Sequence, residues 1–387
     1  MQLADFDFLL SPRGQQWLAE LAQVRLTERT HLQWAMRLRK DVSQTQAHAL
    51  LETAMLRQRA AVKFSRAGQM YFDRQGLEMS SAELISTYRA QKFAPFARVA
   101  DLGCGIGGDA LGLAQHCHVT AVDQDALRLA MVLENARAYG RMRQVETRQA
   151  DLNGLGAFSA EALFFDPARR DEFGRRIHTL ARYRPPLSIL DRWAAQTAHW
   201  GIKVSPAVDL AEIPKQASVE FISVKGELRE AVLWYGVLRS AARTTATLLP
   251  AGEQLDSNAP HSQIGISSPK RYIFEPDAAL IRAQLVQHVA TRLGAQMLDK
   301  TIAYLTGDHA VESSLVKQFI VEAWFPFQLK RLRGYLRERG VGKLTIKKRG
   351  SPLDPDQLRQ QLKPRGSEQR TLILTRHAGK PIVIICL

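Results

Sequence analysis

Cysteine is scarce in this chain: three occur among 387 residues, at Cys104, Cys117 and Cys386. They form no C-x-x-C pair, and an odd, low count argues against a disulfide framework. No cluster of cysteine and histidine has the spacing of metal ligands, so we expect no metal site. These absences exclude the disulfide-stapled and zinc-finger classes.

Long apolar runs are absent as well. No run approaches about 18 residues, the length that a membrane-spanning helix needs. The start of the chain, MQLADFDFLLSPRG, lacks the basic segment followed by an apolar stretch that marks a signal peptide. We therefore expect a cytoplasmic protein with no membrane partner.

Acidic residues are the third shortage. Asp and Glu total 38 against 53 Lys and Arg, which gives a net charge of +15 and an isoelectric point near 10.0. This excess favours a polyanionic partner such as nucleic acid, although surplus arginine also occurs on plain solvated faces. The hydrophobic share of 45% is ordinary for a soluble globular protein, and 387 residues predict two or three domains.

The first two segments of the chain differ in texture. Residues 1–92 have apolar residues three and four apart, and Ser11 followed by Pro12 is a helix-start signal, so we predict a helical domain. In residues 93–249, short β-rich runs such as HVTAVD and ALFFDP alternate with helical stretches, which predicts a parallel sheet with crossover helices. Two runs, SVEFISV and EAVLWYGVL, are joined by KGELR, which is too short for a crossover. We expect them to form an antiparallel hairpin at the sheet edge.

Two further segments complete the chain. Residues 250–268 are rich in Pro, Gly, Ser and Asn, which predicts a linker. Residues 269–387 begin with the helical pattern DAALIRAQLVQHVATRLG and end with the strand-like runs GKLTIKKRG, RTLILTRH and KPIVIICL. This order predicts a separate α+β domain.

One stretch, VADLGCGIGGDALGLA at residues 99–114, is the most informative about function. Its glycines Gly103, Gly105 and Gly108 satisfy the spacing G-x-G-x-x-G between a predicted strand and a predicted helix. Glycines let the backbone approach a ligand, and a helix start offers free N–H groups. Asp123 ends the next predicted strand, where a carboxylate accepts hydrogen bonds from ribose hydroxyls. A nicotinamide cofactor and S-adenosylmethionine (SAM) both fit this pattern.

Three more acids favour SAM over a nicotinamide cofactor. Asp101 stands two residues before the first glycine, where it suits a ligand with an ammonium group and does not suit a pyrophosphate. Asp151 in QADLNG follows the third predicted strand, within reach of an adenine amine, and Asp166 in FFDPARR follows the fourth. Each acid alone is more often a surface or cap residue. An acid at each of four strand ends is a coincidence that a random fold would rarely give.

Together these residues resemble the class I SAM-dependent methyltransferases, whose core motif is D-x-G-x-G. The motifs LRQRAAVKF, AVDQDALRLAMVLENA and FFDPARRDEFGRR resemble more narrowly a bacterial group with a C-terminal THUMP-like domain, indicated by IAYLTGD, KLTIKKRGSPLDPDQLRQQLKPRG and TLILTRHAGKP. The resemblance implies a seven-stranded, Rossmann-like α/β core at residues 93–249 and a THUMP-like, RNA-binding α+β domain at residues 269–387. The group also resembles the trimethylguanosine synthases, which methylate an exocyclic amine of guanine in RNA.

The turn after the fourth predicted strand departs from amine-methylating relatives. In those proteins Asn, Asp or Ser precedes two prolines and an aromatic residue; the first side chain and the proline carbonyl accept hydrogen bonds from the target amine, and the ring stacks on the base. Here Asp166 and Pro167 match, the second proline is missing, and Arg169 replaces the aromatic residue. An arginine plane stacks on a base or binds a phosphate. Alternatively, Arg169 and Arg170 form ion pairs with the two acids that follow them.

A basic stretch, LKRLRGYLRERGVGKLTIKKRGS at residues 329–351, surrounds Tyr335 with lysine and arginine. The positive charge of this stretch suits contacts with nucleic-acid phosphates, and other residues would then supply specificity for the RNA. The alternative is a helix with a charged face followed by an edge strand that lysines protect. We favour RNA because this stretch shares a chain with the methyltransferase-like core.

These patterns give three sets of candidate residues. The expected catalytic residues are Asp166, Pro167 and Arg169. The expected cofactor-binding residues are Asp101, Gly103, Cys104, Gly105, Gly107, Asp109, Asp123, Gln124, Asp151 and Leu152. The expected substrate-binding residues are Arg170, Phe173, Tyr183, Lys330, Arg331, Arg333, Lys347, Lys348 and Arg349. Lys63 and Phe64, in the helical segment, either reach over the cofactor or are a plain surface lysine beside a core aromatic residue.

We therefore predict a SAM-dependent methyltransferase that acts on a base nitrogen of tRNA or rRNA. One rival is a methyltransferase for a small molecule or a protein, which a narrow pocket roofed by residues 1–92 would favour. Another rival is an RNA-binding protein that holds SAM without turnover, which the altered D-P-A-R turn motivates. A dehydrogenase is the weakest interpretation.

Overall fold

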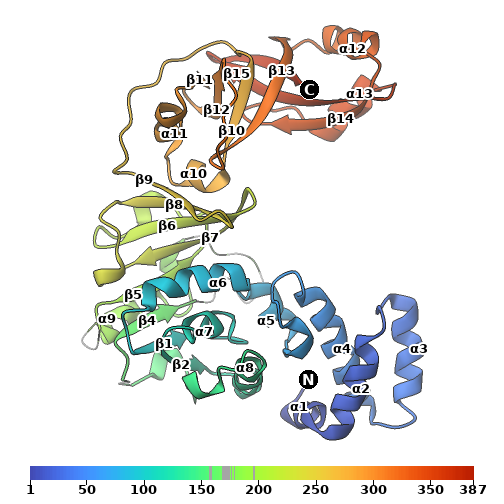
Figure 1. Cartoon of the computed structure of the whole chain (residues 1–387), viewed down its shortest axis with the longest axis vertical. Helices are drawn as coiled ribbons and strands as arrows, with labels where there is room; N and C mark the ends of the chain where they lie inside the picture. Colours follow the sequence, from blue (N-terminus) through green and yellow to red (C-terminus); the bar gives the residue numbers. More distant parts are fainter. Residues whose placement is uncertain (157–158, 168–174, 176, 178, 195–196) are drawn as a thin grey trace. The chain divides into compact units, whose positions relative to one another are not determined.

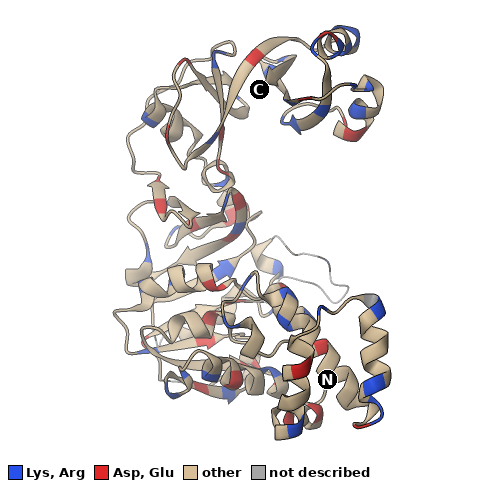
Figure 2. Cartoon of the chain, turned by 45° about the vertical axis from the view of Figure 1, so that its right-hand side comes forward, with Lys and Arg blue, Asp and Glu red and all other residues tan. Residues whose placement is uncertain are grey.

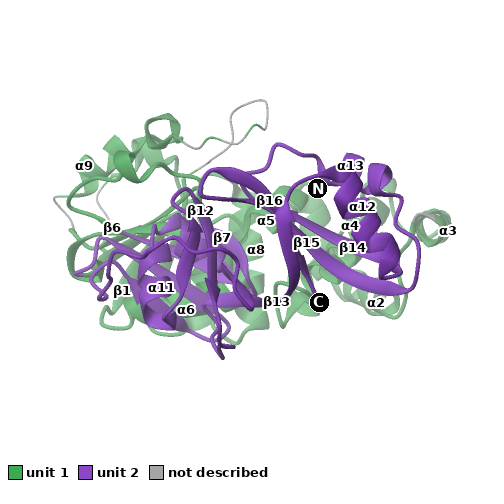
Figure 3. Cartoon of the chain, turned by 90° about the horizontal axis from the view of Figure 1, so that it is seen from above, with its two compact units in different colours: residues 1–218, 231–240 green, residues 219–230, 241–387 purple. Residues whose placement is uncertain are grey.

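The computed structural model describes residues 1–156, 159–167, 175, 177, 179–194 and 197–387. The chain divides into two compact units, residues 1–218 with 231–240 and residues 219–230 with 241–387, coloured separately in Figure 3. Within the described residues, no helix combines the length and the apolar character needed to cross a membrane.

Helices form the first part of the chain, as the apolar spacing predicts (Figure 1, blue). The Ser11 hydroxyl accepts the Gly14 N–H at 3.1 Å, and Pro12 opens the helix that follows, so this predicted helix start is confirmed. The helices are α1 (Leu3–Leu10), α2 (Pro12–Ala22), α3 (Glu28–Leu38), α4 (Gln44–Ala60), α5 (Arg74–Met79) and α6 (Glu83–Ala90).

A sheet of nine strands follows, counted over the described residues, in the order β3-β2-β1-β4-β5-β7-β6-β8-β9. The first five strands pair in parallel, and β7 pairs antiparallel with β5. The strands are β1 (Arg98–Leu102), β2 (His118–Asp123), β3 (Val145–Gln149), β4 (Ala162–Phe165), β5 (Trp200–Val204), β6 (Ser218–Val224), β7 (Glu227–Trp234), β8 (Thr244–Leu249) and β9 (Glu253–Asp256). The helices that connect them are α7 (Gly108–Leu113), α8 (Ala126–Ala138) and α9 (Leu190–Trp193).

Two expectations about this sheet need correction. It has nine strands where seven were expected, and the hairpin of β6 and β7 lies inside the sheet because β8 pairs in parallel with β6. The run TTATLL at residues 244–249 is rich in β-branched and apolar residues, and most of it is buried. Its pairing satisfies backbone groups that β6 would otherwise leave open at an edge. β9 pairs with β8 and lies within the segment that was expected to be a linker.

The last part of the chain contains a second sheet of seven strands, counted over the described residues, in the order β11-β12-β10-β13-β16-β15-β14. Its strands are β10 (Tyr272–Pro276), β11 (Gln296–Asp299), β12 (Ile302–Gly307), β13 (Val316–Pro326), β14 (Val341–Lys348), β15 (Glu368–His377) and β16 (Lys380–Cys386). Its helices are α10 (Ala278–Arg282), α11 (Val286–Leu293), α12 (Leu329–Glu338) and α13 (Pro355–Leu362). The lysine-rich run is edge strand β14, which agrees with the alternative given for this stretch, and Leu332 and Leu336 of α12 pack into the core beside the sheet.

Candidate functional site

The glycine loop follows β1 and begins α7. Gly103, Gly105 and Gly107 have φ values of 76°, 54° and 88°, a region that residues with a side chain rarely adopt. A Cβ on Gly103 would come within 3.0 Å of the Asp166 carbonyl oxygen. The Asp123 carboxylate, at the end of β2, accepts the Gly105 N–H at 2.9 Å and so fixes the loop against the neighbouring strand.

A cavity of about 440 Å³ lies at the carboxyl ends of these strands. Asp123, Asp151 and Asp166 follow β2, β3 and β4 and line it. Neighbouring strands lie about 4.8 Å apart, so the ends of β3, β2, β1 and β4 span about 14 Å. The predicted residues that line the cavity are Gly103, Cys104, Gly105, Asp109, Asp123, Gln124, Asp151, Leu152, Asp166 and Pro167. An elongated ligand therefore contacts several strand ends at once.

Along one side of the cavity lies a cluster of charged residues, here called the buried charge cluster: Asp101, Asp109, Arg89 and Lys203 are buried, and Asp166 is half-buried and lines the cavity. Lys203 Nζ, on β5, donates to Asp166 Oδ2 at 2.7 Å and lies 4.0 Å from Asp109 Oδ2. Arg89, on α6, forms an ion pair with Asp109. Burial acts to raise the pKa of Asp109, but the charges of Arg89 and Lys203 outweigh it and lower that pKa. The carboxylate of Asp166 is thus held by an ammonium group that is itself buried.

Asp101 belongs to this cluster and does not line the cavity. Its side chain is buried within β1, and neither of its carboxyl oxygens has a hydrogen-bond partner among the described residues. Burial, followed by the charges of Asp109 and Asp166, raises the pKa of Asp101 well above its ordinary value. This placement does not support the expected contact with a cofactor ammonium group, because the carboxyl group is fully buried and is not part of the cavity wall. Gly107 also lies outside the cavity wall, where it approaches Val132 on α8.

The substrate side differs from the sequence-based expectation. Tyr183 is buried at 1% exposure and its hydroxyl accepts the Ser205 N–H at 2.7 Å, so it anchors its loop and does not offer a ring to a substrate. The residues after Tyr183 do line the cavity, and they are Arg184, Pro185 and Pro186. The other predicted residues near the turn, Arg169, Arg170 and Phe173, lie outside the described residues.

Sequence reasoning missed Lys203. A lysine within the apolar strand run WGIKV is a signal for a paired internal charge, and its neighbours Ile202 and Val204 are indeed buried. The wall residues Gly76, Met79 and Ser80 were also missed, because they precede the core motif and carry no motif of their own.

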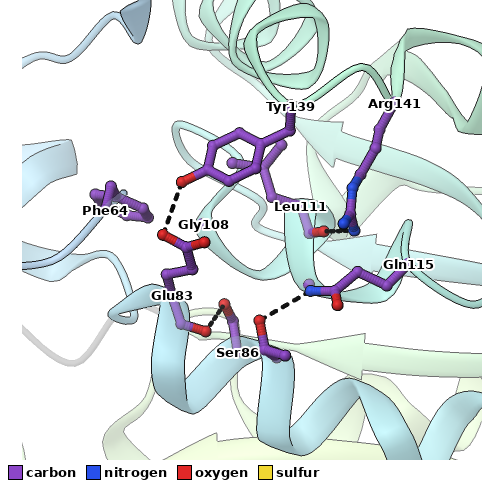
Figure 4. Close-up of a pocket in the computed structure, with 10 residues that line it drawn as sticks. Phe64, Glu83, Ser86, Gly108, Leu111, Gln115, Tyr139 and Arg141 are labelled. Atoms are coloured by element: carbon purple, nitrogen blue, oxygen red, sulfur yellow. Dashed lines mark hydrogen bonds between the residues drawn. The ribbon is translucent and has the colours of Figure 1, made fainter. Parts of the chain in front are cut away.

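A second, smaller cavity of about 180 Å³ lies between α6 and α7 (Figure 4). Tyr139 donates to a Glu83 carboxylate oxygen at 2.9 Å, and Arg141 donates to the Leu111 carbonyl oxygen at 3.1 Å. Phe64, 3% exposed, also lines this space and not the larger cavity. Its volume lies below the range of about 300–1,000 Å³ that is usual for ligand sites, so we assign it no ligand.

The six basic candidates of the last sheet fall into two groups. Lys330, Arg331 and Lys348 are exposed, whereas Arg333, Lys347 and Arg349 are half-buried. The half-buried ones bind within the protein: Arg333 donates to the Gln361 carbonyl oxygen, and both Lys347 and Arg349 face Glu275. The Lys347 ammonium lies 2.5 Å from Glu275 Oε2. Figure 2 colours the charged residues of the chain.

The larger cavity suits SAM in chemistry, and its volume lies within the range of about 300–1,000 Å³ that is usual for ligand sites. A Cβ on Gly105 would meet no atom within 4 Å, so this glycine borders open space in the cradle. Each oxygen of Asp123 accepts one backbone N–H and keeps a lone pair for a ribose hydroxyl. The acids Asp109, Asp151 and Asp166 border a space that suits a positively charged ligand.

Comparisons with known proteins agree with this site. Residues 96–171 match a family described as RNA cap guanine-N2 methyltransferase, residues 316–387 match a THUMP domain-like family, and residues 2–60 match a domain of unknown function. A crystal structure of a candidate methyltransferase from Porphyromonas gingivalis W83 has the same fold, with a TM-score of 0.71 at 21% identity, over 94% of this chain and 99% of that one.

Two curated sequences from Mycobacterium tuberculosis, strains CDC 1551 and H37Rv, are each 34% identical over 341 residues, which cover 84% of this chain and 92% of theirs. Both are described as uncharacterized S-adenosylmethionine-dependent methyltransferases. Identity of this extent over nearly the whole of both chains establishes the family. The chain belongs to the S-adenosylmethionine-dependent methyltransferases, and its cofactor is SAM.

Proposed function

We propose that this methyltransferase transfers the methyl group of SAM to a base nitrogen in RNA, either tRNA or rRNA. The observation that carries the RNA part is the distribution of charge. Residues 316–387, here called the basic region, hold 16 Lys and Arg against 5 Asp and Glu, a net +11 of the +15 of the whole chain. Such a surface attracts phosphates. The same residues match the THUMP domain-like family.

The acceptor side of the cavity supports a planar base as the target. Asp166 and Pro167 stand at the end of β4, and Arg184, Pro185 and Pro186 line the same cavity. Proline rings offer flat apolar faces, and a guanidinium stacks on a base or binds a phosphate. In our proposal these three residues take the place of the second proline and the aromatic ring that the D-P-A-R turn lacks.

Asp166 has the central role in the proposed transfer. When bound, SAM supplies a methyl group on a positively charged sulfur, which the attacking nitrogen displaces as a neutral thioether. The Asp166 carboxylate accepts an N–H of the target amine and so orients the nitrogen lone pair toward the methyl carbon. Lys203 fixes this carboxylate through Oδ2. The amine loses one proton after the N–C bond forms, and water takes it.

Methyl transfer to isolated RNA tests the proposal. The full-length protein is incubated with SAM labelled in its methyl group and with RNA from a strain that lacks the gene, and nucleosides are then separated by mass spectrometry. We expect label on one base nitrogen in this RNA and little label in RNA from the parent strain, where the position is already methylated. Absence of label from every RNA, with SAM binding intact by calorimetry, would overturn the proposal.

The same experiment also tests two other candidates: an RNA-binding protein that holds SAM without turnover, which the altered turn motivates, and a methyltransferase for a small molecule or a protein. If the protein binds SAM and RNA but transfers no methyl group, it is an RNA-binding protein without turnover. If label enters a small molecule or a protein and no RNA, the substrate class is different.

A further inference from the structure

We propose that residues 73–81 form one wall of the SAM site and that Lys63 positions this wall. These residues, here called the cofactor strap, comprise α5 and its flanks, and they lie outside the three segments that match family models. Gly76, Met79 and Ser80 of the strap line the cavity together with the glycine loop. The inference rests on SAM binding alone and does not depend on RNA as the substrate.

Lys63 holds the C-terminal end of the strap helix. Its Nζ donates to the carbonyl oxygens of Leu77 at 2.6 Å, Glu78 at 3.1 Å and Ser80 at 3.1 Å. Carbonyls in the last turn of a helix have no partner within the helix, and the helix dipole favours a cation there. Lys63 does not itself line the cavity, so it acts through the backbone that carries Met79 and Ser80.

The opposite end of the strap is held by Asp73. Its Oδ1 caps the helix by accepting the Gly76 N–H at 2.8 Å, and its Oδ2 accepts a hydrogen bond from Arg128 Nε at 3.0 Å. Arg128 lies on α8 and lines the cavity. A Cβ on Gly76 would come within 2.5 Å of Ile106 in the glycine loop, so the strap approaches that loop as closely as a glycine allows.

The strap also contacts the buried charge cluster through Ser81. The Ser81 hydroxyl donates to Asp109 Oδ2 at 3.2 Å and accepts from Arg89 at 2.8 Å and from Lys203 Nζ at 3.0 Å. Lys203 in turn binds Asp166. Three side-chain anchors, Lys63, Asp73 and Ser81, therefore fix the strap against the segment that follows α4, against α8 and against the cluster. A shift of the strap would change the shape of the cofactor cavity.

Calorimetric SAM titration of full-length variants tests the role of Lys63. Lys63→Met removes the ammonium and keeps the length of the side chain, and we expect SAM affinity to fall by about tenfold or more. Lys63→Arg restores a cation and should stay within about threefold of the parent. Lys215→Met is the matched control, because Lys215 is an exposed lysine outside the cavity wall, and its SAM affinity should not change. A folded Lys63→Met variant with parental SAM affinity would overturn the positioning role.

Hydrogen exchange on the unmodified protein keeps the inference testable if Lys63→Met does not fold. Amides of residues 74–81 should exchange more slowly when S-adenosylhomocysteine or SAM is added, because the ligand closes against the strap. This measurement tests the strap itself, whereas a role of Lys63 in stability alone would appear as a lower unfolding temperature of Lys63→Met with unchanged SAM affinity. Equal exchange of residues 74–81 with and without either ligand would show that the strap is not part of the site.

Discussion

The buried charge cluster beside the cofactor cavity and the basic region at residues 316–387 use charged residues in opposite ways. In the cluster, acids and cations alternate, and the Lys203 side chain, at 4% exposure, touches Asp166 at 2.7 Å. In the basic region one sign dominates, and residues such as Lys330 and Lys348 are exposed. The first arrangement fixes side chains relative to one another, whereas the second presents a field to a partner.

The difference predicts how substitutions behave. A charge left alone in a low-dielectric interior is costly, so variants in the cluster should show large effects that are not additive and that salt barely changes. Exposed charges are screened over about 8–10 Å at physiological salt, so variants in the basic region should show small, additive and salt-dependent effects.

The largest effect is expected at Lys203. Lys203→Met leaves the half-buried Asp166 carboxylate and the buried Asp109 carboxylate without the Lys203 ammonium, and should lower the free energy of unfolding by about 3–5 kcal/mol. The double variant Lys203→Met/Asp166→Asn removes both charges and should regain most of that loss. Urea unfolding of Lys203→Met, Asp166→Asn, the double variant and the parent measures the coupling. If the double variant loses as much free energy of unfolding as the two single variants together, Lys203 and Asp166 do not act as a unit.

Asp166 should show the largest effect on activity. Asp166→Ala should slow methyl transfer at least about a hundredfold, because the target amine loses its acceptor, while SAM affinity stays nearly unchanged. Asp166→Asn keeps an oxygen that accepts hydrogen bonds from Lys203 and from the amine, so it should retain part of the rate. It also serves as the control variant if Asp166→Ala does not fold. Single-turnover transfer of labelled methyl to RNA measures both variants. Parental activity in Asp166→Ala would mean that the turn is structural.

These two residues also show what the sequence reveals and what it conceals. Asp166 was predictable because a strand, an acid and a proline are adjacent in the chain. Its partner Lys203 lies 37 residues further on, and Ser81 lies 122 residues before Lys203, so no local pattern joins them. The glycine loop was predictable for the same local reason as Asp166, since positive φ requires glycine.

The fold was predictable to the same extent. Alternating β-rich and helical runs indicated the parallel strands, and the α/β class is confirmed. The pairing of β8 with β6 was not predictable, because strand order depends on edges that meet only after folding. Tyr183 shows the limit for single residues: an aromatic residue near a turn has the same sequence context whether it faces a substrate or, as here, the core.

Asp123 tests the cofactor end of the cavity. Asp123→Ala removes the acceptor for the Gly105 N–H and for ribose hydroxyls, so SAM affinity should fall by about 1.5–3 kcal/mol, roughly ten- to a hundredfold. Calorimetry with SAM and, as the competing ligand class, NADH provides the measurement. Unchanged SAM affinity in the variant, or tighter binding of NADH than of SAM, would reject this residue as the ribose acceptor.

Asp101 tests whether the cluster responds to pH. Its pKa is raised by burial and by Asp109 and Asp166, so the folded state keeps a proton that the unfolded state releases above its ordinary value of 3.8. Stability from this group is therefore fully present below that value and is lost as pH rises through the folded pKa. Asp101→Asn cannot ionise, so its stability relative to the parent should increase by about 1.4 kcal/mol for each pH unit between the unfolded and the folded pKa. Thermal unfolding without SAM between about pH 5 and pH 8 checks this slope, and a pH-independent difference would contradict it.

The smallest effects are expected in the basic region, where neighbouring lysines of β14 provide an internal control. Lys348 is exposed, while Lys347 is paired with Glu275, and successive residues of a strand face opposite sides. If exposed lysines contact RNA phosphates, Lys348→Gln and Lys330→Gln should each lower the slope of log K against log salt by about 0.7–0.9, and their effects should add. Lys347→Gln should change that slope less, because Glu275 already neutralises its ammonium. Fluorescence anisotropy of the full-length protein with labelled tRNA at several salt concentrations separates these cases. Equal slopes for Lys347→Gln and Lys348→Gln would show that exposure does not decide which lysines contact phosphates. The basic region would then not act as an exposed field that differs from the paired charges of the cluster.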